Sequence, residues 1–453
     1  MSWANNAVFY HIYPLGLCGA PPQNDLHAPT VTRLEKIHSW LDHLQWLGVT
    51  AVILGPVFEA RSHGYDTVDY LQVDRRLGTG ETLGGLVTGM QARGIRVVLD
   101  AVFNHVSRDF FAFRNVCEHL EQSEYWHWFA GIKMGPGSLM GDPFVYEGWN
   151  GHLELVKLNT ANPDVREYLL GIAGEWIERY GVDGFRLDAA DCLDTGFQQQ
   201  LAGFCRGRRK NFWLLGEIVF GDYTQWANER MLDSVTNYEI YKGLYSSLND
   251  HNLFEIAHSL QRQYDPDGIY RDLNLYNFVD NHDVDRIASR LENTALLPLV
   301  YGLLFTIPGI PSIYYGSEWG WPGEKLTESD RLLRPDLDLD TCIREAPHPM
   351  LPDWLRRLAG ARRSSAALQT GRYSSLLIQS EQLVFSRSTG RELMVVALNT
   401  SNREAAVAFT CEKQAGHLVN LLAEKESWPV AAGKMELVLP PYAFKLLNWQ
   451  AGS

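Results

Sequence analysis

Short apolar runs recur along the chain and alternate with stretches in which apolar residues follow helical spacing. The runs are rich in β-branched and aromatic residues and are continuous rather than alternating, as expected for strands buried on both faces. Eight such runs separated by helices predict a parallel sheet that can close into a barrel. The runs are Ala7–Leu15, Ala51–Pro56, Arg96–Val102, Gly184–Ala189, Phe212–Ile218, Ser234–Glu239, Leu275–Asn281 and Pro311–Gly316.

The stretch from Pro163 to Tyr180 has the clearest helical pattern. Asn162 is a suitable N-cap, Pro163 fits the first helical position and Asp164 complements the helix dipole. An apolar stripe at helical spacing predicts packing against the sheet, and Gly181 is expected to end the helix. The stripe consists of Val165, Leu169, Ile172, Ala173, Trp176, Ile177 and Tyr180.

The connection between the third run and this helix is about 60 residues long, far above the usual loop length. It is rich in aromatic residues and glycine, so we expect a small inserted domain, residues 106–156, at the top of the barrel. Such a domain could form one wall of a substrate cleft. For Trp126, Trp128 and Trp149, packing within this domain is favoured over a role as sugar-stacking platforms.

After about residue 365 the pattern changes to short alternating segments separated by turn residues. This pattern is typical of an antiparallel β-sandwich of Greek-key type. The predicted barrel therefore comprises residues 1–105 and 157–364, and the sandwich comprises 365–453. The segments are Leu376–Gln379, Leu383–Ser386, Leu393–Asn399, Ala405–Thr410, Leu418–Leu422, Met435–Leu439 and Ala443–Trp449.

Composition limits the partners. The chain has 453 residues, a formal net charge of -14 and a pI near 5.5, which argues against nucleic acid or an anionic membrane as a partner. The best apolar stretch, Leu296–Ile313, is interrupted by prolines, and the N-terminal residues lack the features of a signal peptide. The six cysteines show no CxxC spacing, so we expect reduced thiols in a cytoplasmic protein.

Polar residues gather where four of the predicted strands end. In a barrel of this type, the C-terminal strand ends line the active site. Buried charges are costly without partners, so several acids at one face exceed what stability requires. These residues are Asp100, Asn104, His105, Arg186, Asp188, Glu217, Asp280, Asn281, His282 and Asp283.

Cleavage of a glycosidic bond with retention needs one carboxylate to attack the anomeric carbon and another carboxyl to protonate the departing oxygen. Glu217 lies in an apolar run, and burial raises the pKa of a carboxyl, which suits the acid. Asp188 follows Arg186 by two residues, so both point to one face of a strand, and the cation is expected to keep the aspartate ionised. The residues thus predict Asp188 as nucleophile and Glu217 as acid/base. The alternative is a purely structural ion-pair cluster.

Four strand-end motifs, DAVFNH (100–105), GFRLDAAD (184–191), LLGEI (214–218) and FVDNHD (278–283), resemble the signature regions of the α-amylase superfamily of glycoside hydrolases. They occur in the same order and at comparable spacing. The resemblance extends to the insertion after the third strand and to a C-terminal sandwich ending in LPPYAFK (439–445). It implies a (β/α)8 TIM barrel carrying both additions.

By this resemblance, Asp188 is the nucleophile, Glu217 the acid/base and Asp283 a third acid that binds sugar hydroxyls and stabilises the transition state. The loop HGYD (63–66) resembles the family loop whose tyrosine stacks under the sugar being cleaved, with His63 and Asp66 shaping the loop. A surface salt bridge is the alternative for the Asp330–Arg334 pair. The residues implied in substrate binding are Tyr65, His105, Arg186, His282, Asp330 and Arg334.

The segment LVKLN (155–159) and Ala190 resemble cyclomaltodextrinases and neopullulanases more than secreted α-amylases. Cys192 stands where that subgroup usually has glutamate, and we find no counterpart of the N-terminal domain that commonly builds its dimer. Acceptor preference and oligomeric state, a homo-oligomer included, therefore stay open. Asn104 matches a calcium ligand of many α-amylases, but further oxygen ligands are not evident, so we expect no metal and no cofactor.

The resulting hypothesis is hydrolysis of α-1,4-glucosidic bonds in maltooligosaccharides, cyclodextrins or related α-glucans through a covalent glycosyl-enzyme intermediate. A transglycosylase or phosphorylase would use the same intermediate with another acceptor. A non-catalytic carbohydrate-binding protein is the third alternative, since fold does not dictate function. The retained acids disfavour it.

Overall fold

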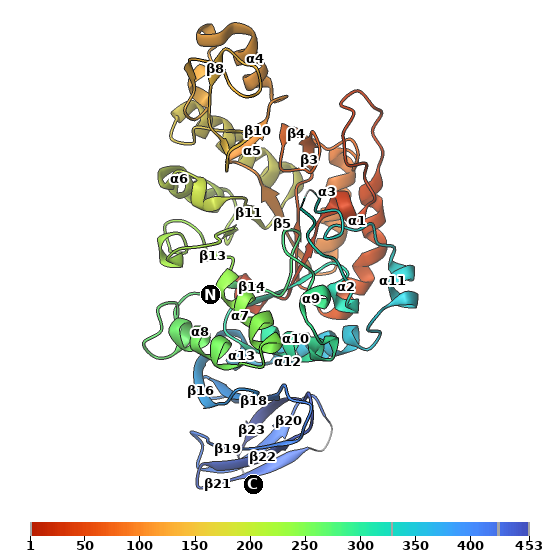
Figure 1. The fold of residues 1–453 in the computed structure, drawn as a ribbon, viewed down its shortest axis with the longest axis vertical. Coiled ribbons are helices and arrows are strands. Elements are labelled where there is room, and N and C mark those ends of the chain that lie inside the picture. The colour runs from red at the N-terminus through yellow and green to blue at the C-terminus, as the bar shows by residue number, and fades with distance from the viewer. Residues whose placement is uncertain (1, 328, 424–425, 452–453) are drawn as a thin grey trace.

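The computed structural model describes residues 2–327, 329–423 and 426–451. Its centre is a sheet of eight parallel strands, some of which are labelled in Figure 1. Their order in the sheet is β13-β12-β11-β5-β2-β1-β15-β14. The strands are β1 (Phe9–Ile12), β2 (Ala51–Leu54), β5 (Arg96–Ala101), β11 (Gly184–Leu187), β12 (Trp213–Gly216), β13 (Ser234–Val235), β14 (Tyr276–Phe278) and β15 (Ile310–Tyr314).

The two outer strands of this order, β13 and β14, also meet. A bridge joins Thr236 to Tyr276, and the Asn237 N–H donates to the Tyr276 carbonyl at 2.9 Å. The sheet therefore closes into a barrel. Each of the eight expected runs overlaps one of these strands, so the predicted TIM barrel is confirmed.

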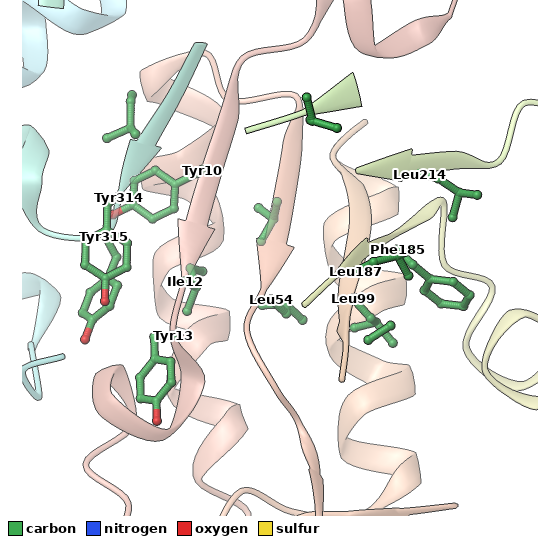
Figure 2. Packing of buried hydrophobic residues seen from close by; sticks show 14 of the residues in the cluster. Tyr10, Ile12, Tyr13, Leu54, Leu99, Phe185, Leu187, Leu214, Tyr314 and Tyr315 are labelled. Carbon is green, nitrogen blue, oxygen red and sulfur yellow. The ribbon is translucent and has the colours of Figure 1, made fainter. Parts of the chain in front are cut away.

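Side chains of the barrel strands alternate between two cores. Phe9, Ile53, Val98 and Leu215 belong to a cluster that fills the barrel interior. The intervening residues face outward and pack under the surrounding helices (Figure 2). The alternation explains why the strands are apolar on both faces. Outward-facing residues include Tyr10, Ile12, Leu54, Leu99, Phe185, Leu187 and Leu214.

Helices cover the outside of the barrel, although the connections differ in form. Among the described residues, β12 and β13 are joined without an α-helix, by a loop that holds only the short η6 (Tyr223–Gln225). The longer helices are α2 (Leu41–Leu47), α3 (Gly80–Ala92), α5 (Pro163–Tyr180), α6 (Thr195–Arg208), α7 (Tyr238–Asn249), α8 (Phe254–Tyr264), α10 (Leu297–Thr306), α11 (Leu339–Glu345) and α12 (Leu351–Ser364). Shorter elements are η1 (Trp3–Asn6), α1 (Pro14–Leu17), η2 (Arg33–Trp40), β3 (Phe58–Ala60), β4 (Thr67–Val73), η5 (Ala190–Cys192), α9 (Ile287–Arg290), η7 (Thr294–Leu296), η8 (Ser317–Trp319) and α13 (Ala366–Thr370).

Helix α5 has the ends that its sequence predicts. The Asn162 side chain accepts from the backbone N–H groups of Asp164 and Val165 at 2.8 and 3.4 Å, which caps the first turn. Gly181 closes the helix in the left-handed conformation, with φ of 60°. The predicted apolar stripe is buried.

The segment after β5 forms a small aromatic-rich unit at one end of the molecule, opposite the C-terminal sheet (Figure 1). Phe113 packs edge-on against Phe129 and Tyr146, and Arg108 pairs with Asp142 at 2.7 Å. This packing holds a segment that has little regular structure. Its elements are β6 (His105–Ser107), α4 (Phe111–His119), η3 (Leu120–Gln122), η4 (Trp126–Trp128), β7 (Lys133–Met134), β8 (Phe144–Val145), β9 (Gly148–Trp149) and β10 (His152–Lys157).

The C-terminal part is a single antiparallel sheet that folds over its own core as a sandwich. Its strands are β16 (Arg372–Ile378), β17 (Gln382–Ser388), β18 (Leu393–Asn399), β19 (Ala405–Thr410), β20 (Ala415–Asn420), β21 (Ser427–Ala431), β22 (Lys434–Leu439) and β23 (Phe444–Gln450). The segments expected from the sequence do not include β21, which contains Pro429, a residue that weakens a strand pattern. The proline is tolerated because β21 pairs with β22 only at Ala431–Lys434.

Two buried arginines join the sandwich to the barrel. Arg362 of α12 donates to the carbonyls of Leu368 and Gly309 at 2.9 and 2.6 Å. Arg387 of β17 donates to the carbonyls of Thr306 and Gly371, at 2.8 and 2.9 Å. Burial lowers the pKa of Arg362 to about 9 and that of Arg387 to about 10. Among the hydrogen bonds of the described residues, carbonyl oxygens are their only acceptors.

The sequence predicts the lack of a membrane-spanning stretch and six reduced cysteines, and both can be compared with the structure. No helix within the described ranges is both long and apolar enough to cross a bilayer. All six cysteines are free thiols, four of them buried.

Candidate active site

The polar strand ends lie together at the C-terminal mouth of the barrel. Asp100 belongs to β5 and Arg186 to β11, where the two residues are directly opposite in register. Asp188 follows β11, Glu217 follows β12 and Asp283 lies in the loop after β14. Parallel strands end at a common edge, so side chains from four elements converge on one pocket.

Arg186 is the centre of this pocket. Its Nη1 lies 2.8 Å from Asp100 and 2.9 Å from Asp188, and its Nη2 lies 2.8 Å from Glu217. One buried guanidinium therefore holds three carboxyl groups, and Asp188 and Glu217 face the same space. The nearby acids raise the pKa of Arg186, which outweighs the effect of its burial.

Burial dominates the acids around Arg186. It raises the pKa of Asp188 to about 7 and that of Asp100 to about 6, and it raises the pKa of Glu217 as well, although Arg186 opposes all three shifts. Arg186 lowers the pKa of Asp188, as expected from the sequence, but burial has the larger effect, so the pKa is raised overall. The sequence could not reveal that one buried cation is shared by three carboxyl groups.

The chain turns sharply after Asp188. Ala189 has φ of 44° in the left-handed region, which is uncommon for a residue other than glycine. The Ala189 N–H donates to Glu217 Oε2 at 3.2 Å. Strain of this kind concentrates at functional sites.

Asp283 lies in a different electrostatic setting. His282 Nε2 lies 2.9 Å from its Oδ2, and Arg334 Nη2 donates to its Oδ1 at 2.9 Å. Burial alone would raise the pKa of Asp283, but His282 and Arg334 hold it well below its ordinary value. Arg334 also pairs with Asp330 at 2.9 Å, so this pair belongs to the pocket network instead of being an isolated surface salt bridge.

Aromatic rings form one wall of the pocket. Tyr65 stacks on His282 with ring centroids 5.3 Å apart, and its hydroxyl donates to Asp100 at 3.0 Å. Tyr13 stacks on His282 at 6.0 Å and donates to the His63 carbonyl at 2.6 Å. His63 Nδ1 in turn accepts from the Tyr65 N–H at 3.2 Å, which agrees with its expected role in shaping the loop.

His105 faces the pocket from the other side. Asn104 Nδ2 lies 3.1 Å from His105 Nδ1, which places the ring proton on Nε2, 3.9 Å from Asp188. Burial lowers the pKa of His105 to about 3, so the ring is neutral. Nε2 is buried and has no hydrogen-bond partner among the described residues. Trp149 lies 5.6 Å from this ring, whereas Trp126 and Trp128 are buried in packing.

Three residues of the pocket were not among the predicted site residues. Asp100 was noted at a strand end, but only its contacts with Arg186 and Tyr65 show that it belongs to the active site. Tyr13 lay inside a predicted strand. Tyr238 did too, although it opens α7, and its hydroxyl lies 3.5 Å from Glu217. For the two tyrosines the sequence offered little indication of a role in the site, since aromatic residues in apolar runs usually belong to the core.

The arrangement combines three carboxyl groups on one guanidinium, a separate ionised carboxylate and a neutral histidine beside them. It fits acid–base and nucleophilic chemistry at an acetal centre. Within residues 2–327, 329–423 and 426–451, no cluster of three or more histidine, cysteine or acidic residues could hold a metal.

Comparison with known proteins identifies the family. Residues 24–341 match the model of the alpha amylase catalytic domain, and residues 376–446 match the model of the maltogenic amylase C-terminal domain. The chain is 30% identical to a cyclomaltodextrinase from Geobacillus thermopakistaniensis (strain MAS1), covering 98% of this chain and 77% of that protein.

Comparison with solved structures agrees with these family matches. A debranching enzyme from Nostoc punctiforme has a TM-score of 0.83 and 29% identity, covering 98% of both chains. A cyclic alpha-maltosyl-(1→6)-maltose hydrolase from Arthrobacter globiformis has a TM-score of 0.80 and 26% identity over 98% of this chain and 99% of that chain. These matches cover both the barrel and the sandwich. With the carboxyl groups gathered at the mouth of the barrel, they show that the chain is a glycoside hydrolase and belongs to the alpha-amylase family.

Proposed function

We propose that this enzyme hydrolyses α-1,4-glucosidic bonds in maltooligosaccharides, cyclodextrins or related α-glucans with retention of anomeric configuration. The observation that carries the proposal is the placement of Asp188 and Glu217 on the two terminal nitrogens of the Arg186 guanidinium, at 2.9 and 2.8 Å. That placement keeps two carboxyl groups within reach of a single glycosidic bond. The name of the cyclomaltodextrinase relative supports the substrate class.

In the first step, the Asp188 carboxylate attacks the anomeric carbon while Glu217 gives its proton to the departing oxygen. The glycosidic C–O bond breaks and a glycosyl ester forms on Asp188. In the second step, Glu217 takes a proton from a water molecule that attacks the same carbon, and Asp188 leaves as a carboxylate. The raised pKa of Glu217 suits the acid role, since the group keeps its proton above the ordinary range of a glutamate.

The remaining site residues bind and orient the sugar. Asp283, held ionised by Arg334 and His282, accepts hydrogen bonds from sugar hydroxyls and stabilises positive charge at the anomeric carbon. His105 donates from its unpartnered Nε2, and Tyr65 presents a ring for stacking. Arg334 and Asp330 position Asp283 from the opposite side.

A panel of cyclodextrin, maltotriose, starch, pullulan and sucrose tests the proposal. The name of the Arthrobacter globiformis relative is the reason to include pullulan, which tests α-1,6 linkages. We expect turnover of at least one α-1,4-linked substrate, with the α-anomer as the first product in proton NMR. A β-anomer formed first, or binding without turnover, would contradict the proposal. Adding glucose or phosphate as an acceptor separates hydrolysis from transfer, since transfer yields new oligosaccharides or a sugar phosphate.

We also propose that the chain divides into a barrel of residues 1–105 and 157–364, an insert of 106–156 and a sandwich of 365–453. The end of α12 at Ser364 supports the last boundary. The six free thiols support a cytoplasmic location. Limited proteolysis with mass spectrometry tests the boundaries, which predict cleavage near 106, 156 and 365 before other sites.

A further inference from the structure

A cleft lies where the barrel helices meet the C-terminal sandwich. Its volume is about 390 Å³, within the usual range of ligand pockets, and none of the active-site residues lines it. The end of α7, the loops after α7 and α9 and the end of η7 supply one side, and turns of the sandwich supply the other. Two structural units thus build a second concave surface.

Hydrogen bonds across the junction fix the shape of this cleft. His251 Nδ1 lies 3.2 Å from Glu381 Oε1, and the Leu253 N–H donates to the Ser380 carbonyl at 2.8 Å. On the barrel side, Asn249 donates to the Arg290 carbonyl at 2.9 Å and accepts from the Glu292 N–H at 3.1 Å. The walls are therefore preorganised.

Two residues of the cleft have a strained backbone. His251 has φ of 48° and Tyr442 has φ of 50°, both in the left-handed region that favours glycine. Such conformations persist where the surrounding structure holds them, and they concentrate at ligand sites. The same feature occurs at Ala189, beside the proposed nucleophile.

The lining has the chemistry of a site for neutral sugars. Tyr442 is half-buried and packs against the core, beside a floor formed by Leu248 and Leu296. An aromatic ring beside apolar side chains suits the C–H face of a pyranose. The amide of Asn402 can both donate to and accept from hydroxyl groups, and Asn293 Nδ2 can donate, although its Oδ1 already accepts from the Ala295 N–H at 3.0 Å.

The acidic residues in the cleft select among ligands. Glu292 and Glu381 both line it, and carboxylates repel phosphorylated or other anionic ligands while accepting hydrogen bonds from hydroxyls. We infer that this cleft is a second, non-catalytic binding site for a neutral oligosaccharide, namely a stretch of the α-glucan chain. The choice of α-glucan depends on the proposed function.

Calorimetric titration of the full chain with maltoheptaose tests the inference. The Asp188→Asn background prevents turnover, and we expect two binding events. Adding Tyr442→Ala should weaken one event at least about tenfold, the usual effect of truncating a central aromatic contact, whereas Tyr442→Phe should keep both. Phe254→Ala is the matched control, because Phe254 is an exposed aromatic on the neighbouring α8 that does not line the cleft.

Activity measurements separate this inference from the proposed function. With Asp188 intact, Tyr442→Ala should leave turnover of maltotriose unchanged. If Tyr442→Ala fails to fold, Asn402→Trp fills the cleft from an exposed position and should remove the same event. Two binding events of unchanged affinity in Tyr442→Ala and in Asn402→Trp would overturn the inference alone. A single event in the Asp188→Asn parent would do the same, provided that the unmodified enzyme turns over maltotriose. If the unmodified enzyme neither bound nor turned over α-glucans, that result would instead overturn the proposed function.

Discussion

Two groups of buried arginines hold this molecule together in opposite ways. At the mouth of the barrel, Arg186 lies among three carboxyl groups and Arg334 among two. At the junction with the sandwich, Arg362 and Arg387 donate to backbone carbonyls instead. The acids raise the pKa of Arg186, whereas burial lowers the pKa of Arg362.

The difference shows what each region is built to do. Carboxyl groups around a buried cation are costly to assemble, and stability alone does not require them. Carbonyl groups at chain ends and turns need donors in any case, and an arginine can satisfy several at once. Substitutions should therefore separate activity from stability between the two regions.

The largest expected effect is on catalysis at the mouth. Asp188→Asn keeps the shape of the side chain but removes the nucleophile, so kcat on maltotriose should fall at least about 10⁴-fold. The melting temperature should hardly change, because one buried charge disappears with its desolvation cost. Asp191→Asn, in an exposed position three residues further, is the matched control. A fall of less than tenfold would remove Asp188 from the role of nucleophile.

Arg186→Met should damage both properties. It leaves Asp100, Asp188 and Glu217 buried without their shared cation, which costs about 3–5 kcal/mol of stability for a broken buried pair. Turnover should fall by about 10³-fold or more, because the nucleophile and acid lose the group that sets their spacing. Urea unfolding and steady-state kinetics measure the two effects, and an active variant of unchanged stability would contradict the central role of Arg186.

Arg362→Met should affect stability alone. The carbonyls of Gly309 and Leu368 lose a charge-assisted donor, which costs about 1.5–3 kcal/mol. The kcat of the folded fraction should stay within about twofold of the unmodified enzyme, since none of the hydrogen bonds that Arg362 makes in the described part of the chain involves an active-site residue. A selective loss of kcat at full stability would mean that the junction communicates with the active site.

The smallest expected effect is a shift in pH dependence. Burial raises the pKa of Asp188 to about 7, so kcat/KM should fall as the pH drops below that value and the nucleophile takes up a proton. Asp100→Asn removes a negative charge close to Asp188, and it leaves Arg186 with two carboxylates to pair with instead of three. Each of these effects lowers the pKa of Asp188. The acid limb of the profile should then move to lower pH. A shift to higher pH would contradict the electrostatics described for the pocket.

Local signals in the sequence were sufficient for much of this architecture. Helix α5 is framed by Asn162, Pro163 and Gly181, each of which acts through its own backbone geometry. The strands of the barrel follow from apolar continuity, and the acids at their ends from the topology of a barrel. These features depend on neighbours in the chain or on a general rule of the fold.

The contacts and pKa shifts of the active site could not be predicted from the sequence, because they depend on distances across the barrel. Asp100 and Arg186 are 86 positions apart in the chain, and only their register on adjacent strands makes them partners. The pKa of Asp188 depends on how many groups share that arginine. Tyr238 looked like the end of a strand, because the apolar pattern does not show where β13 stops and α7 begins.

The guanidinium of Arg186 has a consequence for the whole reaction cycle. When the proposed first step begins, Asp188 carries a negative charge and Glu217 is neutral. After it, the ester on Asp188 is neutral and Glu217 is the anion. The charge has only moved from one terminal nitrogen of Arg186 to the other, so the total around the cation stays constant and no counter-ion has to enter or leave the site.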